Sequence, residues 1–199
     1  MGDLILITGG VRSGKSQFAE QMAHKLGGDR VVYVATAEAG DDEMRLRIAA
    51  HRADRPGAWR TLEDPLDVAG ALAKASGALE PPRVLLVDCL TMLVSNLLLA
   101  GPEATAASRV NGQVAAIRSA CLETSASVII VTNEVGWGVV PPSSLGRQYR
   151  DLLGTANQAL AADATQVLVL IAGLAVDWKA LAASRGDLAA CSTSSETLA

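Results

Sequence analysis

Residues 4–16 have the sequence LILITGGVRSGKS, and this stretch decides the fold of the chain. A short apolar run leads into two glycines, and the segment from Gly9 to Ser16 matches the pattern GxxxxGK[ST]. Glycines in this pattern let backbone N–H groups surround a phosphate, and the helix that follows points its positive end at the same anion. We therefore expect a buried strand, a phosphate-binding loop and a helix that begins near Lys15.

The side chains of this loop indicate a nucleoside triphosphate and Mg²⁺ as its ligands. Lys15 is expected to reach the β- and γ-phosphates, which makes it a catalytic candidate, and the Ser16 hydroxyl can ligate Mg²⁺. A plain glycine-rich turn is the alternative, but the complete pattern after an apolar strand argues against it. The predicted nucleotide-binding residues of the loop are Gly9, Gly10, Val11, Arg12, Ser13, Gly14, Lys15 and Ser16.

Outside the loop, apolar strands and helical stretches alternate along the chain. Further runs rich in β-branched and apolar residues occupy positions 31–35, 84–88, 128–133 and 166–172. Helical spacing is present at residues 15–26, 42–53, 66–76, 91–100, 103–124 and 144–162. Such alternation implies crossover connections between parallel strands. We therefore expect an α/β fold of the P-loop NTPase (RecA-like) type, with a mostly parallel central sheet flanked by helices on both faces.

Length and charge limit the domain count and the partners. The chain has 199 residues, which fits one catalytic domain, placed at residues 1–180. The polar end at residues 181–199 is expected to be a flexible tail. Seventeen Lys and Arg against 21 Asp and Glu give a net charge of −4, so no basic field is available to hold nucleic acid. Small molecules are therefore the expected ligands.

Cysteine usage and hydropathy indicate the compartment. Three widely spaced cysteines argue against a disulfide framework or a zinc site. The N-terminus has no basic segment and its apolar run is too short for a signal peptide. The longest apolar segment, residues 84–100, is interrupted by polar residues and is not expected to span a membrane. We therefore expect a cytoplasmic protein.

Asp88 follows the apolar run at residues 84–87, where a parallel sheet delivers side chains to the edge beside the phosphate loop. It is suited to hold Mg²⁺, directly or through water. Alternatively, it caps the helix expected to begin near Thr91. Both interpretations place Asp88 near the nucleotide.

A histidine lies among arginines in the helix expected at residues 42–53. Helical spacing puts Arg47, His51 and Arg55 on one face. The guanidinium groups can neutralise approaching phosphate oxygens, and such a histidine can act as a nucleophile at phosphorus. The alternative, which the spacing alone favours, is a solvated helix face with an incidental histidine.

Another loop follows the strand expected at residues 128–133. Asn133 and Glu134 precede two glycines that flank Trp137. At the ligand edge of a sheet, this loop would offer a carboxylate and a flat aromatic ring to a substrate. It can equally be a glycine-bearing connector in which Trp137 is buried.

Four segments together resemble one family, the bifunctional adenosylcobinamide kinase/adenosylcobinamide-phosphate guanylyltransferases of cobalamin biosynthesis. They are the phosphate loop and residues 42–51, 59–63 and 133–141, in this order, and the resemblance runs from about Leu4 to Lys179. Many NTPases share the phosphate loop, but the histidine segment and the Asn133 segment together are specific to this family.

The resemblance implies two reactions. In the first, ATP or GTP phosphorylates the hydroxyl of the aminopropanol side chain of adenosylcobinamide. In the second, a histidine takes GMP from GTP with loss of pyrophosphate, and the phosphorylated cobinamide then takes the GMP to give adenosylcobinamide-GDP. His51 falls at the position of that catalytic histidine.

The resemblance also implies ligand contacts and an assembly. Guanine-nucleotide contacts are expected from Thr36, Ala37, Glu38, Arg52, Arg55, Glu63 and Asp88. The carboxylates among them can accept from guanine N–H groups or hold Mg²⁺. A homo-oligomer is implied, namely a symmetric trimer with the His51 helix near a neighbouring subunit.

Two other functions are compatible with the residues. One is a P-loop kinase of another small alcohol, which would transfer phosphate but form no covalent nucleotide. The other is a nucleotide-gated binding protein without catalysis. The second requires an interaction surface, and the sequence contains no long apolar patch or extra module to supply it.

Overall fold

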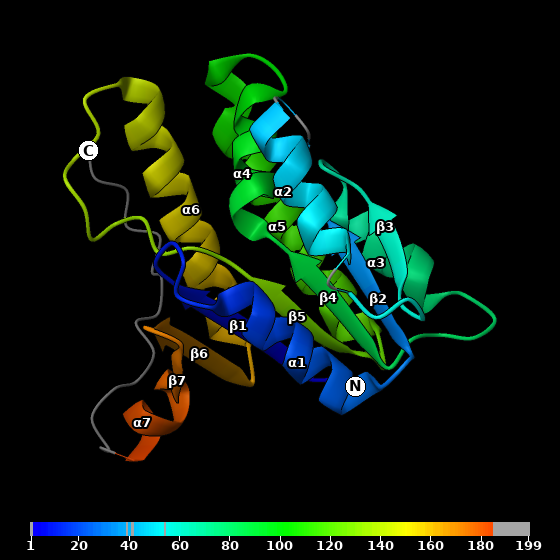
Figure 1. The fold of residues 1–199 in the computed structure, drawn as a ribbon. Helices are drawn as coiled ribbons and strands as arrows, with labels where there is room; N and C mark the ends of the chain where they lie inside the picture. Colours follow the sequence, from blue (N-terminus) through cyan, green and yellow to red (C-terminus); the bar gives the residue numbers. More distant parts are fainter. Residues whose placement is uncertain (1, 39, 41, 54, 185–199) are drawn as a thin grey trace.

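The computed structural model describes residues 2–38, 40, 42–53 and 55–184, which form a seven-stranded sheet with helices around it (Figure 1). The strands are β1 (Leu4–Gly9), β2 (Val31–Ala35), β3 (Arg60–Glu63), β4 (Val84–Asp88), β5 (Ser127–Val131), β6 (Gln166–Ile171) and β7 (Leu174–Asp177). The helices are α1 (Lys15–Gly27), α2 (Asp42–Ala53), α3 (Val68–Ser76), α4 (Leu90–Leu99), the 3₁₀ turn η1 (Glu103–Thr105), α5 (Ala106–Glu123), α6 (Ser144–Asp163) and α7 (Trp178–Ser184).

The strands lie in the order β3-β2-β4-β5-β1-β6-β7. All neighbouring pairs are parallel except β6 and β7, which pair antiparallel. β1 lies between β5 and β6, so Ile7 pairs with Val131 on one side and Leu168 on the other. The continuous apolar runs of β1, β2, β4 and β5 match this position, because both faces of a parallel sheet are covered.

Helices cover both faces of the sheet, as expected from the alternation of strands and helices. On one face, residues of α3, α4, α5 and α6 pack with Leu6, Leu85 and Ile130 of the strands. On the other face, α1 packs through Ala19 and Ala23. Figure 1 shows α1 in front of the sheet and the group from α3 to α6 behind it. The predicted fold class is confirmed by this arrangement.

The structure adds two strands and a helix that the sequence analysis did not predict. β3 and β7 have four residues each, lie at opposite edges of the sheet and are partly exposed, so they lack a long apolar run. β7 follows a tight turn in which Ala172 and Gly173 have φ of 51° and 82°. The stretch predicted as one helix at 103–124 consists of η1 and α5.

The C-terminal boundary also differs from the expectation. A flexible tail was predicted to begin at residue 181, but α7 extends to Ser184 and packs on β6. Strand β7 runs antiparallel to β6 and so brings the chain back along the sheet, and α7 begins directly after it at Trp178. Residues 185–199 lie outside the described residues. Within the described part of the chain, no helix is long and apolar enough to cross a membrane.

Candidate functional site

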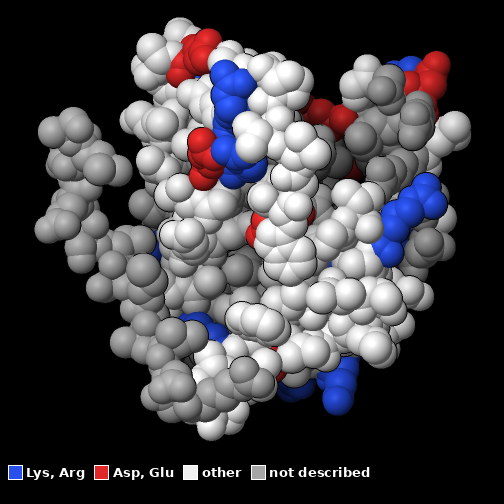
Figure 2. Space-filling model, turned by 90° about the vertical axis from the view of Figure 1, so that its left-hand side faces the viewer, with Lys and Arg blue, Asp and Glu red and all other residues white. Residues whose placement is uncertain are grey.

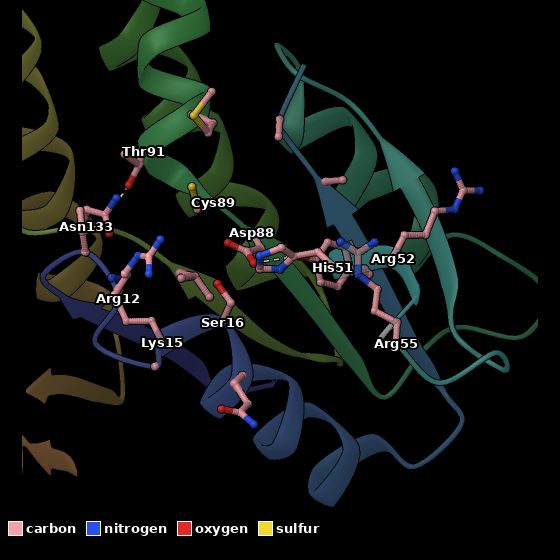
Figure 3. Close-up of a pocket in the computed structure, with 18 of the residues that line it drawn as sticks. Arg12, Lys15, Ser16, His51, Arg52, Arg55, Asp88, Cys89, Thr91 and Asn133 are labelled. Atoms are coloured by element: carbon pink, nitrogen blue, oxygen red, sulfur yellow. Dashed lines mark hydrogen bonds between the residues drawn. The ribbon is translucent and has the colours of Figure 1, made fainter. Parts of the chain in front are cut away.

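The carboxyl ends of the parallel strands open into a cavity of about 940 Å³ (Figure 3). The phosphate loop and the start of α1 form one wall, and residues of α2, β3 and the segment between them form the other. This is the edge at which a parallel sheet presents side chains to ligands. The lining residues are Val11, Arg12, Ser13, Gly14, Lys15, Ser16, Gln17, Tyr33, Ala35, Ala37, Glu38, His51, Arg52, Arg55, Glu63, Pro65, Asp88, Cys89, Thr91, Met92, Val131 and Asn133.

The phosphate loop has the conformation that its glycines permit. Gly14 precedes α1 with φ of 94°, a left-handed conformation in which a side chain is strained. At Gly9, a Cβ atom would lie 2.3 Å from the carbonyl oxygen of Leu170 on the neighbouring strand. The loop therefore turns sharply between β1 and α1, and the first N–H groups of α1 face the cavity.

Lys15 is buried within its own loop, with 8% of its surface exposed. Its ammonium donates to the carbonyl of Gly10 at 2.6 Å and to the hydroxyl of Ser13 at 3.5 Å. Burial lowers the pKa of Lys15, and the nearby Cys89 and Asp88 partly oppose that shift. Phosphate oxygens bound in the loop would provide stronger acceptors for the same ammonium group.

Asp88 ends β4 and lies between the phosphate loop and His51 in Figure 3. Its Oδ2 accepts a hydrogen bond of 2.8 Å from the hydroxyl of Tyr33. The residue caps no helix here, because Cys89 is the residue before α4 and its side chain makes no capping hydrogen bond. The alternative role of Asp88 as a helix cap is therefore wrong.

The oxygens of Ser16 and Asp88 fit Mg²⁺. Both side chains line the cavity, one at the start of α1 and the other at the end of β4, and both offer the hard oxygen ligands that this ion prefers. Among the described residues, no group of three or more His, Cys, Asp or Glu is placed to hold a metal. Nucleotide-bound Mg²⁺ does not need such a group, because phosphates and water supply most of its ligands.

His51 is half-buried near the end of α2, and its side chain enters the cavity across from the phosphate loop (Figure 3). Next to it, Nη1 of Arg52 lies 3.5 Å from Oε1 of Glu63 on β3, and both side chains are about two-thirds exposed. The structure thus brings three of the predicted site residues together at this wall.

The predicted common face of Arg47, His51 and Arg55 is not observed. The helix ends at Ala53, so Arg55 follows it, and the side chain of Arg47 lies outside the described residues. Arg55 instead stacks on Tyr33, with its guanidinium carbon 3.3 Å from the ring centroid. It contributes only part of the cavity wall.

The segment after β2 is divided between the cavity and the core. Ala37 and Glu38, for which nucleotide contacts are predicted, line the cavity. Thr36 is fully buried behind the wall, where its hydroxyl donates to the carbonyl of Cys89 at 2.7 Å and accepts from the Cys89 N–H at 2.8 Å. The Thr36 side chain therefore does not reach the cavity, and its hydrogen bonds connect the end of β2 to the residue after β4.

The loop after β5 contributes to the cavity through one residue. Asn133 lines it, and its backbone N–H donates to the hydroxyl of Thr91 at 2.9 Å. Glu134 instead accepts from the N–H of Gly136 at 2.6 Å, within its own loop. Trp137 is 79% exposed, so the alternative in which it is buried by packing is wrong.

Some lining residues escaped the sequence analysis, above all Tyr33. Tyr33 stands within the apolar run at residues 31–35, where a buried tyrosine needs a hydrogen-bond partner for its hydroxyl. Thr91 stands at the start of the helix expected at residues 91–100. The short connection between β4 and α4 places the Thr91 hydroxyl at the beginning of α4. The hydrogen-bond partners of these two hydroxyl groups could not be located without the tertiary fold.

Comparison with known proteins identifies the family. Residues 5–178 match the family model described as cobinamide kinase / cobinamide phosphate guanyltransferase. The chain belongs to this family. It is similar to the "Bifunctional adenosylcobalamin biosynthesis protein CobP" of Pseudomonas aeruginosa, with 46% identity over 90% of this chain and 98% of that protein. It is also similar to the "Bifunctional adenosylcobalamin biosynthesis protein CobU" of Escherichia coli, with 40% identity over 88% of this chain and 99% of that protein.

Membership of the cobinamide kinase / cobinamide phosphate guanyltransferase family confirms the resemblance drawn from the sequence and the prediction of an enzyme of cobalamin biosynthesis. The fold is also found in a distant solved structure, the ATPase domain of G40P. It has a TM-score of 0.52 and 15% identity, and the match covers 85% of this chain and 69% of that chain. That similarity shows a P-loop ATPase fold, as the phosphate loop predicted.

Proposed function

We propose that this protein phosphorylates adenosylcobinamide with ATP or GTP and then transfers GMP from GTP to the product, giving adenosylcobinamide-GDP and pyrophosphate. One observation carries the proposal: the phosphate loop and His51 line the same cavity from opposite walls. A triphosphate held by the loop would thus have a histidine within the same cavity. Neither a plain kinase nor a binding protein needs that residue there.

In the kinase step, the loop N–H groups and Lys15 hold the β- and γ-phosphates of the donor. The hydroxyl oxygen of the aminopropanol side chain forms a bond to the γ-phosphorus, and the bond from that phosphorus to the bridging oxygen breaks. The hydroxyl loses its proton in this step, so the products are adenosylcobinamide phosphate, a nucleoside diphosphate and a proton. Mg²⁺, held with the help of Ser16 and Asp88, would neutralise charge on the phosphate oxygens.

In the guanylyl transfer, an imidazole nitrogen of His51 bonds to the α-phosphorus of GTP while pyrophosphate leaves. A phosphate oxygen of adenosylcobinamide phosphate then bonds to the same phosphorus, and the P–N bond breaks and restores the imidazole. Splitting the transfer into two displacements is the general advantage of a covalent intermediate. The side chain of Arg52 lines the cavity with that of His51, and its guanidinium group would neutralise the phosphate charge.

The remaining cavity residues are assigned to the nucleotide. Ala37, Glu38 and Glu63 line the wall on the His51 side, where the guanine base would lie. Carboxylates such as these can accept hydrogen bonds from the guanine N1–H and N2–H groups, which adenine lacks in that arrangement. This contact would select GTP for the second reaction.

We also propose that the protein is a homo-oligomer. The family resemblance implies a trimer. Exposed apolar side chains at the β6–β7 edge and α7 support this, namely Ile171, Leu174, Val176 and Trp178. Figure 2 shows this side of the molecule, on which most of the described surface is uncharged. Light scattering of the purified protein tests the assembly.

Both nucleoside triphosphates are available in the cytoplasm, where we place the reaction.

The decisive experiment incubates the protein with Mg²⁺ and GTP labelled on the α- or the γ-phosphate, followed by denaturation. We expect protein-bound α-label that resists alkali and is released by acid, as a phosphoramidate is, and no bound γ-label. Retention of neither label, with continued consumption of GTP in the presence of cobinamide, would leave only the kinase.

A further inference from the structure

A buried tyrosine contacts the carboxylate at the centre of the cavity. Tyr33 lies in β2, is 2% exposed, and donates its hydroxyl hydrogen to Oδ2 of Asp88 at 2.8 Å. The described residues provide no hydrogen bond to the other carboxylate oxygen, Oδ1. One oxygen of Asp88 is thus occupied, and the second is left for ligands in the cavity.

The tyrosine ring is itself held by a cation. The guanidinium carbon of Arg55 lies 3.3 Å from the ring centroid, a close cation–π contact. Arg55 has only 9% of its side chain exposed, and its Nε lies 4.0 Å from Oε1 of Glu20 on α1. The contacts join α1, β2 and β4 with the segment that follows the His51 helix.

We propose that Tyr33 is a positioning residue for the metal-assisted chemistry: its hydroxyl fixes one oxygen of Asp88 so that the other is directed at the nucleotide-bound cation, and Arg55 locks the ring. The inference rests on the proposed function, because it assigns Asp88 to the cation. Guanine recognition by Asp88 is the competing assignment.

A phenol suits this task better than a charged donor. An arginine or lysine at the same place would neutralise the carboxylate and weaken its attraction for a cation. The Tyr33 hydroxyl holds the oxygen and leaves the negative charge in place.

The test removes only the hydroxyl, in Tyr33→Phe. The probe is Mn²⁺ in the presence of GTP, with free Mn²⁺ measured by electron paramagnetic resonance. Losing a hydrogen bond to a charged group lowers an equilibrium constant by about tenfold. We therefore expect the Kd for Mn²⁺ to rise roughly tenfold. Cobinamide phosphorylation should lose kcat by a similar factor with KM for cobinamide unchanged. Unchanged Mn²⁺ affinity would overturn the inference, whatever the effect on stability.

A double variant separates positioning from a merely structural role. Asp88→Asn removes the charge that the cation needs. If Tyr33 acts through Asp88, adding Tyr33→Phe to Asp88→Asn should cause little further loss of Mn²⁺ affinity. If the loss of Mn²⁺ affinity in the double variant equals the product of the two single-variant losses, the inference is contradicted. The hydroxyl would then act independently of the carboxylate.

The second tyrosine of the chain supplies a matched control. Tyr149 on α6 is also partly buried, and its hydroxyl donates to the carbonyl of Thr91 at 3.4 Å, away from Asp88. Tyr149→Phe should leave Mn²⁺ affinity within twofold of the wild-type value. An equal loss in both variants would show a general packing effect and overturn the assignment to Tyr33.

The outcome is distinguishable from a failure of the proposed function. Mn²⁺ binding with GTP is measured without cobinamide and without any covalent nucleotide, so it tests Tyr33 even if His51 is never guanylylated. Conversely, a normal wild-type kinase and guanylyltransferase with an unaffected Tyr33→Phe variant would leave the proposed function standing. A rise in Kd for GTP alone, at unchanged Mn²⁺ affinity, would assign Asp88 to the base.

Discussion

The two walls of the cavity are built in different ways. The phosphate-loop wall is a continuous segment between β1 and α1, with Lys15 and Ser13 buried in it. In the opposite wall, the described side chains of α2 are exposed or half-buried, and Arg52 meets Glu63 in a solvated ion pair. The first wall is thus anchored by two buried polar side chains, whereas the described α2 side chains of the second wall keep contact with solvent. Substitutions in the two walls should therefore differ in their effect on stability.

The largest difference between the walls should follow from His51→Ala. The variant lacks the nitrogen that bonds to the α-phosphorus, so protein-bound α-label from GTP should disappear completely, while the kinase rate stays within about twofold. His24→Ala is the control, since His24 lies in the last turn of α1 outside the 940 Å³ cavity. Loss of kinase activity in a folded His51→Ala protein would contradict the division of roles.

Lys15→Ala should damage both reactions, because both use the same loop. Removing a preorganised charge that contacts reacting phosphates costs about 10²–10³-fold in rate. Initial rates of cobinamide phosphorylation and of α-label incorporation measure the two effects, and circular dichroism checks the fold. A variant that lost only one of the two reactions would show that the walls bind separate nucleotides.

Gly9→Ala tests how rigid the loop wall is. Its Cβ would lie 2.3 Å from the Leu170 carbonyl oxygen, and φ is 147°, so we expect the free energy of unfolding to fall by about 2–3 kcal/mol. Urea denaturation measures the change. Gly10→Ala is the matched control because no atom lies within 4 Å of its added Cβ, and it should cost far less. Equal losses would mean that the contact with β6 is unimportant.

The smallest stability effect is expected on the other wall, for Arg52→Gln. The Arg52–Glu63 pair is 3.5 Å apart and about two-thirds exposed, so the free energy of unfolding should change by less than about 0.5 kcal/mol. The KM for GTP should nevertheless rise severalfold if Arg52 neutralises phosphate. Arg45→Gln, an exposed α2 residue outside the cavity lining, is the control for both measurements. An unchanged KM would remove Arg52 from the nucleotide site.

Most of the fold could be predicted because its signals are local. The central strands are continuous apolar runs, and their ends were predicted to within a few residues, as the run at 84–88 shows. The edge strands β3 and β7 were not predicted, since four partly exposed residues form a strand only when a neighbouring strand supplies the hydrogen bonds. Likewise, no local pattern distinguishes α7 from an irregular tail.

The candidate site was predicted in part for the same reason. The phosphate loop is one segment, so its residues were found directly, and His51 was found through the family resemblance. Thr36 and Arg55 are both predicted to contact the nucleotide. The side chain of Thr36 is buried behind the cavity wall, whereas Arg55 lines the cavity and stacks on Tyr33. Which side chain of a short segment faces a cavity depends on the elements that pack around it, and those are remote in sequence.

The amino-acid sequence by itself determined the phosphate loop, the alternation of strands and helices, and the family, because each depends on residues close together in the chain. Only the tertiary structure decided that Asp88 is held by Tyr33, from which it is 55 positions distant, and that His51 shares a cavity with Lys15. Contacts of this kind arise when parallel strands end at a common edge. Strand order, which the sheet as a whole selects, brings those ends together.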